Sequence, residues 1–327
     1  MRVFARPASL QVGLGFADHI CMGFWYENNN FYISSNRSHI EQYFTIFLAF
    51  RPYFSNIQIR PNRKDLRMNT RPYVGITDFT SFEQVTRMLE VFRRHRQSDS
   101  KRQLHIGVMM SYKTLNCIET KWSKAFPPKE TIADIFGLTD DADDLYYCLH
   151  YADYDHDTKF TDLACGIEYA GPWVNAVQLD MPWPDPGVVA SGVHTSRKQI
   201  EVILQVGKRS IEEADDDPAE VVRRLEDYEG VIHRVLLDKS MGRGLGMDAA
   251  GLIPFARAIK DRFPNLGLVA AGGLGPESIN LVEPLAKELP DLSIDAQEKL
   301  RPSGNALDPI DWDMAGAYLA KALGLLK

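Results

Sequence analysis

Cysteines are few in this sequence, and long apolar runs are missing. Four cysteines occur among 327 residues, they lie far apart, and no CxxC pair is present. This argues against a disulfide scaffold and a cysteine zinc site, and it fits a reducing cytoplasm. No apolar stretch reaches the roughly 18 residues that span a bilayer, so we expect no membrane segment. The N-terminus lacks a charged-then-apolar signal pattern, so we expect no export.

The overall composition is that of a folded globular protein, but the charge is distributed unevenly. Hydrophobic residues make up 45% and charged residues 25% of the chain, which excludes intrinsic disorder, collagen and coiled coil. Residues 1–67 hold eight Lys+Arg and four Asp+Glu, a net charge of +4, together with 13 aromatics. The other 260 residues hold 29 Lys+Arg and 40 Asp+Glu, a net charge of −11, and 21 aromatics. The chain therefore changes character at about residue 68.

Residues 1–67 form an N-terminal extension with two possible origins. The extension has one lysine against seven arginines, contains a run of three asparagines, and lacks a clear helical or strand period. It is either an accessory segment or the product of an overcalled start codon, in which case Met68 is the true beginning. In both cases we expect residues 68–327 to be the functional unit. Their charge of −11 and the lack of a basic aromatic face argue against a nucleic-acid partner.

Short β-branched runs alternate with amphipathic helical stretches from Met68 onward. Helix starts are predicted at Thr80, by a capping box with Glu83, and at Asp217, by an N-cap before Pro218. Further helices are expected near 129–136, at 159–170, at 249–262, from Pro276 and from about Asp313. Eight strands are predicted, at residues 73–76, 104–110, 145–151, 174–179, 201–206, 234–237, 266–270 and 292–294.

Eight such strand–helix units indicate an α/β fold. Continuous apolar strands are covered on both faces, which is typical of a parallel sheet. Eight units in about 260 residues fit a closed (β/α)8 TIM barrel, here with an N-terminal extension. The competing fold is an open doubly wound sheet, but its glycine fingerprint does not follow the first strand. We therefore predict the barrel.

The carboxyl ends of the predicted strands carry several aspartates. Asp180, Asp238 and Asp295 end the fourth, sixth and eighth strands, so a barrel brings them to one face. Asp180 and Asp238 suit acid–base work if burial separates their pKa values. A divalent cation is the rival use, because hard cations prefer several oxygen ligands. His150, at the end of the third strand, is expected to be packed or at the surface rather than catalytic.

Two glycine clusters are candidates for ligand binding. Residues 242–246 (GRGLG) follow the sixth strand, and their glycines allow close approach of a ligand. Gly272 and Gly273 follow the seventh strand, ahead of the helix expected at Pro276. Because barrels often bind phosphate after strands seven and eight, we predict a phosphate site at this second cluster.

These motifs, in this order and spacing, resemble the phosphoribosylanthranilate isomerase family. The resemblance covers residues of about 70–327 and rests on the segments 75–78, 176–180, 235–238, 242–246 and 268–277. It implies a cytoplasmic barrel enzyme of tryptophan biosynthesis, an intramolecular oxidoreductase that converts an aldose to a ketose without a cofactor or metal. The expected partner is a small phosphorylated substrate, and the oligomeric state stays open. Asp238 would be the general acid, and the residues implied to bind substrate or phosphate are Gln178, Arg243, Gly244, Gly246, Gly272 and Gly273.

The sequence departs from this family at the base and at the last phosphate turn. Val74 stands where the family has its catalytic cysteine, so the base would have to be Asp78 or Asp180. Asp180 itself stands where histidine is usual. After the eighth strand, Glu298 brings a negative charge into the expected phosphate turn, which Lys299 or Arg301 could offset.

Three functions therefore remain open. The first is isomerisation, or related chemistry, of a phosphorylated sugar or its amine. The second is a metal-dependent lyase or aldolase in which the three strand-end aspartates hold Mg²⁺; Lys239 as a Schiff-base nucleophile is a subsidiary form of it, although strand alternation turns Lys239 away from the interior. The third is a non-catalytic barrel that binds a phosphate-bearing ligand.

Overall fold

The computed structural model describes residues 10–12, 23–27, 30–34, 71–137, 142–239 and 247–326. The chain divides into two compact units, Met1–Arg60 and Pro61–Lys327. The first holds an antiparallel sheet of the strands β1 (Leu10–Val12), β2 (Gly23–Glu27) and β3 (Asn30–Ser34). The boundary predicted between residues 67 and 68 lies outside the described residues.

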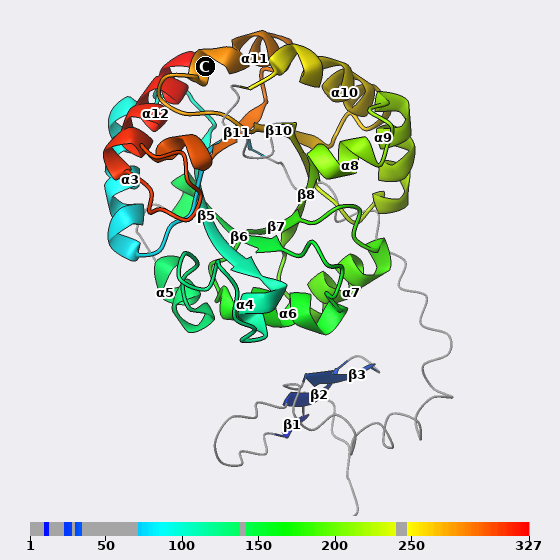
Figure 1. Cartoon of the computed structure of the whole chain (residues 1–327). Coiled ribbons are helices and arrows are strands. Elements are labelled where there is room, and N and C mark those ends of the chain that lie inside the picture. Colours follow the sequence, from blue (N-terminus) through cyan, green and yellow to red (C-terminus); the bar gives the residue numbers. More distant parts are fainter. Residues whose placement is uncertain are drawn as a thin grey trace, which may run out of the picture. The chain divides into compact units, whose positions relative to one another are not determined.

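Eight parallel strands close into a barrel in the second unit (Figure 1). Each strand lies within two residues of its predicted bounds, so the predicted (β/α)8 barrel is confirmed. The strands follow one another around the barrel in chain order, and β11 closes it against β4. They are β4 (Tyr73–Thr77), β5 (Gln103–Ser111), β6 (Leu145–Ala152), β7 (Ala176–Asp180), β8 (Glu201–Gly207), β9 (Arg234–Asp238), β10 (Gly267–Ala271) and β11 (Ser293–Ala296).

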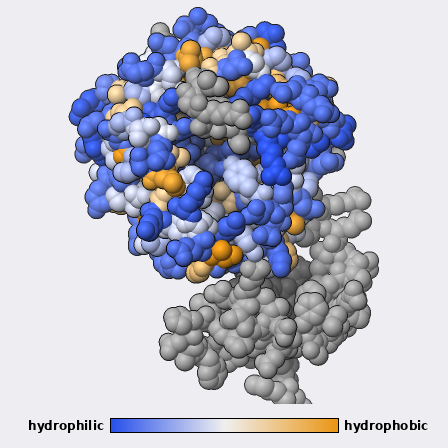
Figure 2. Space-filling model, viewed as in Figure 1, coloured by the Kyte–Doolittle hydropathy of each residue, from blue (hydrophilic) through white to orange (hydrophobic). Residues whose placement is uncertain are grey.

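A ring of helices surrounds this barrel (Figure 1). The α-helices are α3 (Phe82–His95), α4 (Tyr112–Leu115), α5 (Ile132–Ile135), α6 (Phe160–Tyr169), α7 (Pro186–Ser196), α8 (Lys208–Glu212), α9 (Pro218–Leu225), α10 (Ala249–Arg262), α11 (Glu283–Glu288) and α12 (Trp312–Leu325). Short 3-10 turns are η2 (Lys129–Thr131), η3 (Ala142–Asp144), η4 (Glu226–Tyr228), η5 (Ile279–Val282) and η6 (Glu298–Leu300). Figure 2 shows one face of the molecule, on which hydrophilic residues predominate. None of the helices in the described ranges is long and apolar enough to cross a membrane.

Of two predicted helix starts, one is confirmed and the other is shifted by one residue. Helix α9 begins as predicted, because the Asp217 carboxylate accepts a hydrogen bond from the Ala219 N–H at 2.9 Å. Helix α3 begins one residue later than expected, after the N-cap Ser81. The reason is that the side chain of Gln84, not that of Glu83, reaches back to accept the Ser81 N–H, at 3.2 Å.

The helix predicted to begin at Pro276 is wrong. The chain instead turns after β10, forms η5, and enters α11 at Glu283. The Ser278 hydroxyl donates to the Gly273 carbonyl at 2.7 Å and stabilises the turn. A Cβ atom at Gly275 would lie 2.8 Å from the Lys299 carbonyl oxygen, so this turn packs tightly on the loop after β11. No helix N-terminus therefore stands directly behind Gly272 and Gly273.

Strand alternation creates two apolar cores. One lies between the barrel and the helices and includes Val74 and Ile76 of β4. The other fills the barrel interior with Tyr73, Tyr146, Cys148, Ala176, Ile203, Leu236 and Val269. Because successive residues of a strand point to opposite sides, Val74 belongs to the outer core and not to the interior.

The interior is closed by an ion pair at the end where the strands begin. Arg234 Nε lies 2.8 Å from the Glu201 carboxylate, and both side chains are buried. The Tyr146 hydroxyl donates to the same carboxylate at 2.5 Å. The guanidinium also lies over the rings of Tyr73 and Tyr146, 5.2 and 5.1 Å from their centroids. This cluster fills the barrel interior at the end where the strands begin.

Candidate functional site

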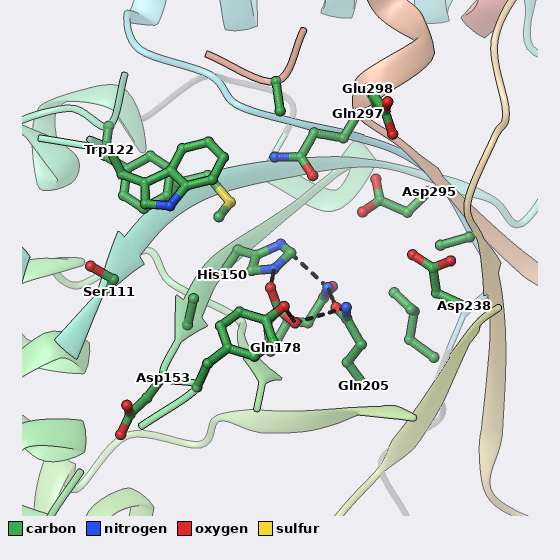
Figure 3. Close-up of a pocket in the computed structure, with 18 of the residues that line it drawn as sticks. Ser111, Trp122, His150, Asp153, Gln178, Gln205, Asp238, Asp295, Gln297 and Glu298 are labelled. Carbon is green, nitrogen blue, oxygen red and sulfur yellow. Dashed lines mark hydrogen bonds and ion pairs between the residues drawn. The ribbon is translucent and has the colours of Figure 1, made fainter. Parts of the chain in front are cut away.

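A cavity of about 560 Å³ lies at the carboxyl ends of the strands. Strands β5 to β11 all contribute side chains to its wall, and the segment after β5 adds Trp122 and Phe126. These two rings stack with their centroids 5.6 Å apart. Figure 3 shows Trp122 on one side of the pocket and Asp238, Asp295 and Glu298 on the other. The cavity thus has one aromatic side and one acidic side.

Four side chains from three adjacent strands form a closed ring in this wall. Gln205 Nε2 donates to Asp180 Oδ1 at 2.9 Å, and Gln178 Nε2 donates to Gln205 Oε1 at 2.9 Å. Gln178 Nε2 also lies 3.3 Å from His150 Nδ1, and His150 Nε2 lies 3.4 Å from Asp180 Oδ2 (Figure 3). The Tyr154 hydroxyl adds a further hydrogen bond to Asp180, at 2.6 Å. Asp180 is thereby fixed in position from several sides.

His150 is packed, one of the two placements expected for it, and it also lies on the cavity wall. Burial lowers the pKa of this imidazole, but the hydrogen bond and charge of Asp180 outweigh it, and the pKa is raised above its usual value. A histidine paired with a carboxylate can hold and release a proton near neutral pH. The signal was present in β6, where Tyr146, Cys148 and His150 alternate toward the interior.

Asp295 is a buried carboxyl group at the floor of the cavity. Its Oδ2 accepts a hydrogen bond from the Thr77 hydroxyl at 2.8 Å. Its Oδ1 lies 3.8 Å from His105 Nδ1 and has no hydrogen-bond partner among the described residues. Burial raises the pKa of Asp295 to about 6, although the Thr77 hydrogen bond opposes the shift. Burial likewise lowers the pKa of His105 to about 3, so this histidine is neutral.

Asp238, the predicted general acid, lines the same cavity from the end of β9. Its charge acts on two neighbours. Burial raises the pKa of Tyr154, and the charges of Asp180 and Asp238 raise it further. Burial also raises the pKa of Glu298, and Asp238 again adds to the shift while Lys299 opposes it. Asp238 therefore stands between the Asp180 ring and the loop after β11.

Asp78, the other predicted base, does not line the cavity. Its carboxylate pairs with the Arg301 guanidinium and accepts a hydrogen bond from Gln297 Nε2 at 2.9 Å. Its backbone has a φ of 91°, a value that strongly favours glycine. The residue therefore ties β4 to the loop after β11, a structural task.

The predicted substrate-binding residues divide into two groups. Gln178, Gly272 and Gly273 line the cavity, and the two glycines have φ angles of 93° and 68° that only glycine adopts easily. Arg243, Gly244 and Gly246 lie outside the described residues. The glycine turn after β10 is thus present at the cavity, and the loop after β9 stays a prediction.

Three further observations concern the metal-dependent alternative. Asp180, Asp238 and Asp295 all line the cavity. Within the described ranges, however, no three His, Cys, Asp or Glu side chains gather closely enough to hold a metal ion. Lys239 turns away from the interior as its strand position predicts, and pairs with Asp216 at 2.9 Å.

No protein-family model matches this chain, and no curated protein matches it either. What is shown is the closed eight-stranded barrel, an architecture that many kinds of enzyme share. The resemblance carried by the short motifs therefore stays a prediction, and function has to be argued from the site.

Proposed function

We propose that this barrel is an acid–base enzyme that isomerises a sugar or its amine, the reaction class that the family resemblance implies. The observation that carries the proposal is the arrangement of Asp238 and the His150–Asp180 pair in the wall of one cavity. They belong to β9, β6 and β7, so a bound molecule can contact both at once. The cavity volume of about 560 Å³ suits a small molecule.

Aldose-to-ketose conversion needs one group that gives a proton and one that takes a proton. Asp238 acts as the acid and protonates the ring oxygen while the C1–O bond breaks. The His150–Asp180 pair acts as the base and removes the proton from C2. The resulting enediol or enaminol then gains a proton at C1 and loses the proton of its C2 hydroxyl, which gives the ketose form. Asp180 orients and charges His150 in this scheme, which replaces the cysteine that Val74 cannot supply.

The phosphate implied by the resemblance is not part of this proposal. The Gly272–Gly273 turn at the cavity favours it, but the Glu298 carboxylate in the same wall does not. The metal-dependent lyase and the non-catalytic barrel are alternatives that no particular contact in the described residues favours.

The test compares Asp238→Asn, His150→Gln and the wild-type protein on a panel of aldoses, aldosylamines and their phosphates. Release of tritium from C2 into water detects the proton transfer without assuming a product. We expect each variant to lose about 10²–10⁴-fold in rate. Asp216→Asn is the matched control, because Asp216 pairs with Lys239, the residue after Asp238, but lies outside the cavity wall.

Three outcomes would count against the proposal. These are no exchange with any substrate, equal rates in Asp238→Asn and the wild type, or complete loss of activity with a chelator. Rescue of a tryptophan auxotroph separately tests the specific tryptophan-pathway reaction.

A further inference from the structure

The end of the cavity where phosphate was expected carries a carboxylate. The turn after β10 and the 3-10 turn η6 after β11 both line the cavity there, the first with Gly272 and Gly273 and the second with Glu298. The two loops are packed together, since a Cβ atom at Gly275 would lie 2.8 Å from the Lys299 Cβ. Figure 3 shows Glu298 on the same side of the pocket as Asp238 and Asp295.

Arg301, three residues after Glu298 in the sequence, is committed to other partners. The Arg301 side chain is buried, pairs with Asp78, and donates to the carbonyl oxygens of Gln297, at 2.8 Å, and Asp308, at 2.6 Å. All of these partners are protein groups, so the guanidinium is held inside the loop. It does not line the cavity, but its charge and that of Lys299 oppose the rise in the pKa of Glu298, so the expected offset of the Glu298 charge is present in part.

The described cavity wall as a whole is predominantly acidic. It contains six carboxylates and two lysines, and no arginine. Lys113 pairs with Asp155 at 2.6 Å, and Lys121 lies over the Trp122 ring, 5.0 Å from its centroid. Both lysines come from the segment after β5, away from the two loops that carry Gly273 and Glu298. A dianion at those loops would meet several negative charges at short range.

Two buried oxygens at the cavity floor, in contrast, accept no hydrogen bond from the described residues. Gln178 Oε1 and Asp295 Oδ1 are buried and have no hydrogen-bond partner among the described residues. Both residues line the cavity and are at most 5% exposed. Since buried polar atoms are nearly always hydrogen-bonded, these oxygens indicate a ligand that donates hydrogen bonds. Hydroxyl and amino groups donate, whereas a phosphate dianion does not.

We infer that Glu298 selects against phosphate and that the natural ligand is an unphosphorylated sugar or amino sugar, whose hydroxyl groups a polyol or amino polyol shares. Its hydroxyl or amino groups donate to Gln178 and Asp295 at the floor, and the end beside Gly273 carries a neutral or cationic group that Glu298 accepts. This inference rests on the proposed function for the position of the site. It does not depend on the reaction, because it concerns binding alone.

The test measures binding by thermal shift and calorimetry with four probes. They are inorganic phosphate, ribitol, 1-amino-1-deoxyribitol and ribitol 5-phosphate, and the last three differ only in the group at one end. With the wild-type protein we expect the amino polyol to bind at least as tightly as ribitol, and ribitol 5-phosphate to bind at least tenfold more weakly than ribitol. Inorganic phosphate should give no shift.

Glu298→Gln removes the charge and keeps the shape of the side chain. In this variant we expect affinity for ribitol 5-phosphate to rise at least tenfold and affinity for the amino polyol to fall. Glu277→Gln is the matched control, because Glu277 is on the neighbouring loop but is exposed and pairs with Lys321 outside the cavity wall. The control should bind all four probes as the wild type does.

Each other outcome overturns the inference. Stronger binding of phosphate or ribitol 5-phosphate than of ribitol by the wild type would do so, and so would a Glu298→Gln variant that gains no affinity for either phosphate. Failure of both unphosphorylated polyols to bind the wild type would exclude this class of compound as the ligand. Turnover of phosphoribosylanthranilate by the wild type would support the proposed reaction and overturn this inference. Polyol binding without any C2 exchange would support this inference and count against the proposed reaction.

Discussion

The two ends of the barrel interior hold similar polar side chains but satisfy them differently. Where the strands begin, Arg234 and Glu201 form a buried ion pair, and Tyr146 adds a hydrogen bond to the carboxylate. Where the strands finish, buried polar atoms lack a partner within the described part of the chain. They include Gln178 Oε1 and Asp295 Oδ1.

This difference separates stability from ligand binding within one barrel. A buried polar group left without a hydrogen bond costs about 1–3 kcal/mol, so the carboxyl end is destabilised until a ligand pairs with it. At the opposite end the Arg234–Glu201 ion pair is satisfied, although the Tyr73 hydroxyl has no partner among the described residues. Barrels generally keep chemistry at the carboxyl ends of their strands. Substitutions at the two ends should therefore have different consequences.

The largest effect is expected from Arg234→Met. This variant leaves the Glu201 carboxylate buried without its cation, which should lower the free energy of unfolding by about 3–5 kcal/mol in urea denaturation. The matched control is Arg257→Met, which breaks an exposed ion pair with Glu288 and should cost about 0–1 kcal/mol. Equal losses in the two variants would contradict the structural role assigned to the Arg234 cluster.

The opposite sign is expected from Asp295→Asn at the carboxyl end. The folded-state pKa of Asp295 is raised to about 6 from an ordinary value of 3.8, so the folded protein is penalised once the group ionises. The stability that the folded protein has with Asp295 protonated is fully present below pH about 4 and is lost as the pH rises through 6. The asparagine avoids the penalty and should gain about 2–3 kcal/mol over the wild type between pH 4 and pH 7.

Urea unfolding of both proteins at pH 4, 5, 6 and 7 measures this gain. Asp216→Asn, which changes an exposed aspartate, is the control and should follow the wild type across the series. A difference between Asp295→Asn and the wild type that is independent of pH would mean that Asp295 does not titrate in this range.

A smaller effect is expected on the titration of His150. Asp180 raises the pKa of this imidazole, so Asp180→Asn should lower it, and NMR of the imidazole signals during a pH titration measures the change. The sign for stability follows from the raised pKa. Protonated His150 stabilises the fold at low pH, and that contribution is lost as the pH rises through its folded pKa. A pKa of His150 that does not move in Asp180→Asn would disprove the pairing.

Most of the barrel could be predicted from the sequence because its signals are local. Each strand is a short apolar run, and caps such as Asp217 act within one helical turn. The start at Pro276 failed because a contact distant in sequence intervenes there, the packing of Gly275 against Lys299. A proline at a favourable position is a permissive signal that such packing can override.

The site was less predictable because its partners are distant in sequence. Strand ends identified Asp180 and Asp238 as cavity residues. The commitment of Asp78 to Arg301 joins residues 223 positions apart, and no local pattern announces it. The position of His150 follows from the alternation of β6, a signal that the residue type alone does not carry.

The smallest effect is expected from restoring the cysteine that the family resemblance places at Val74. Alternation along β4 turns Val74 toward the helices, where it is fully buried in the outer core. A thiol at this position cannot reach the cavity. Val74→Cys should therefore leave C2 proton exchange unchanged, and the number of thiols that react with a disulfide reagent in the native protein should equal that of the wild type.

Ala271→Cys is the matched comparison, because Ala271 lies on the cavity wall at the end of β10. Its thiol should react in the native protein, and prior binding of a polyol should slow the reaction. Labelling of Val74→Cys at the same rate as Ala271→Cys, or a gain in exchange rate in Val74→Cys, would show that β4 presents residue 74 to the interior. In that case a residue on β4 could act as the base at the carboxyl end of the barrel, and His150 would no longer be needed to remove the C2 proton.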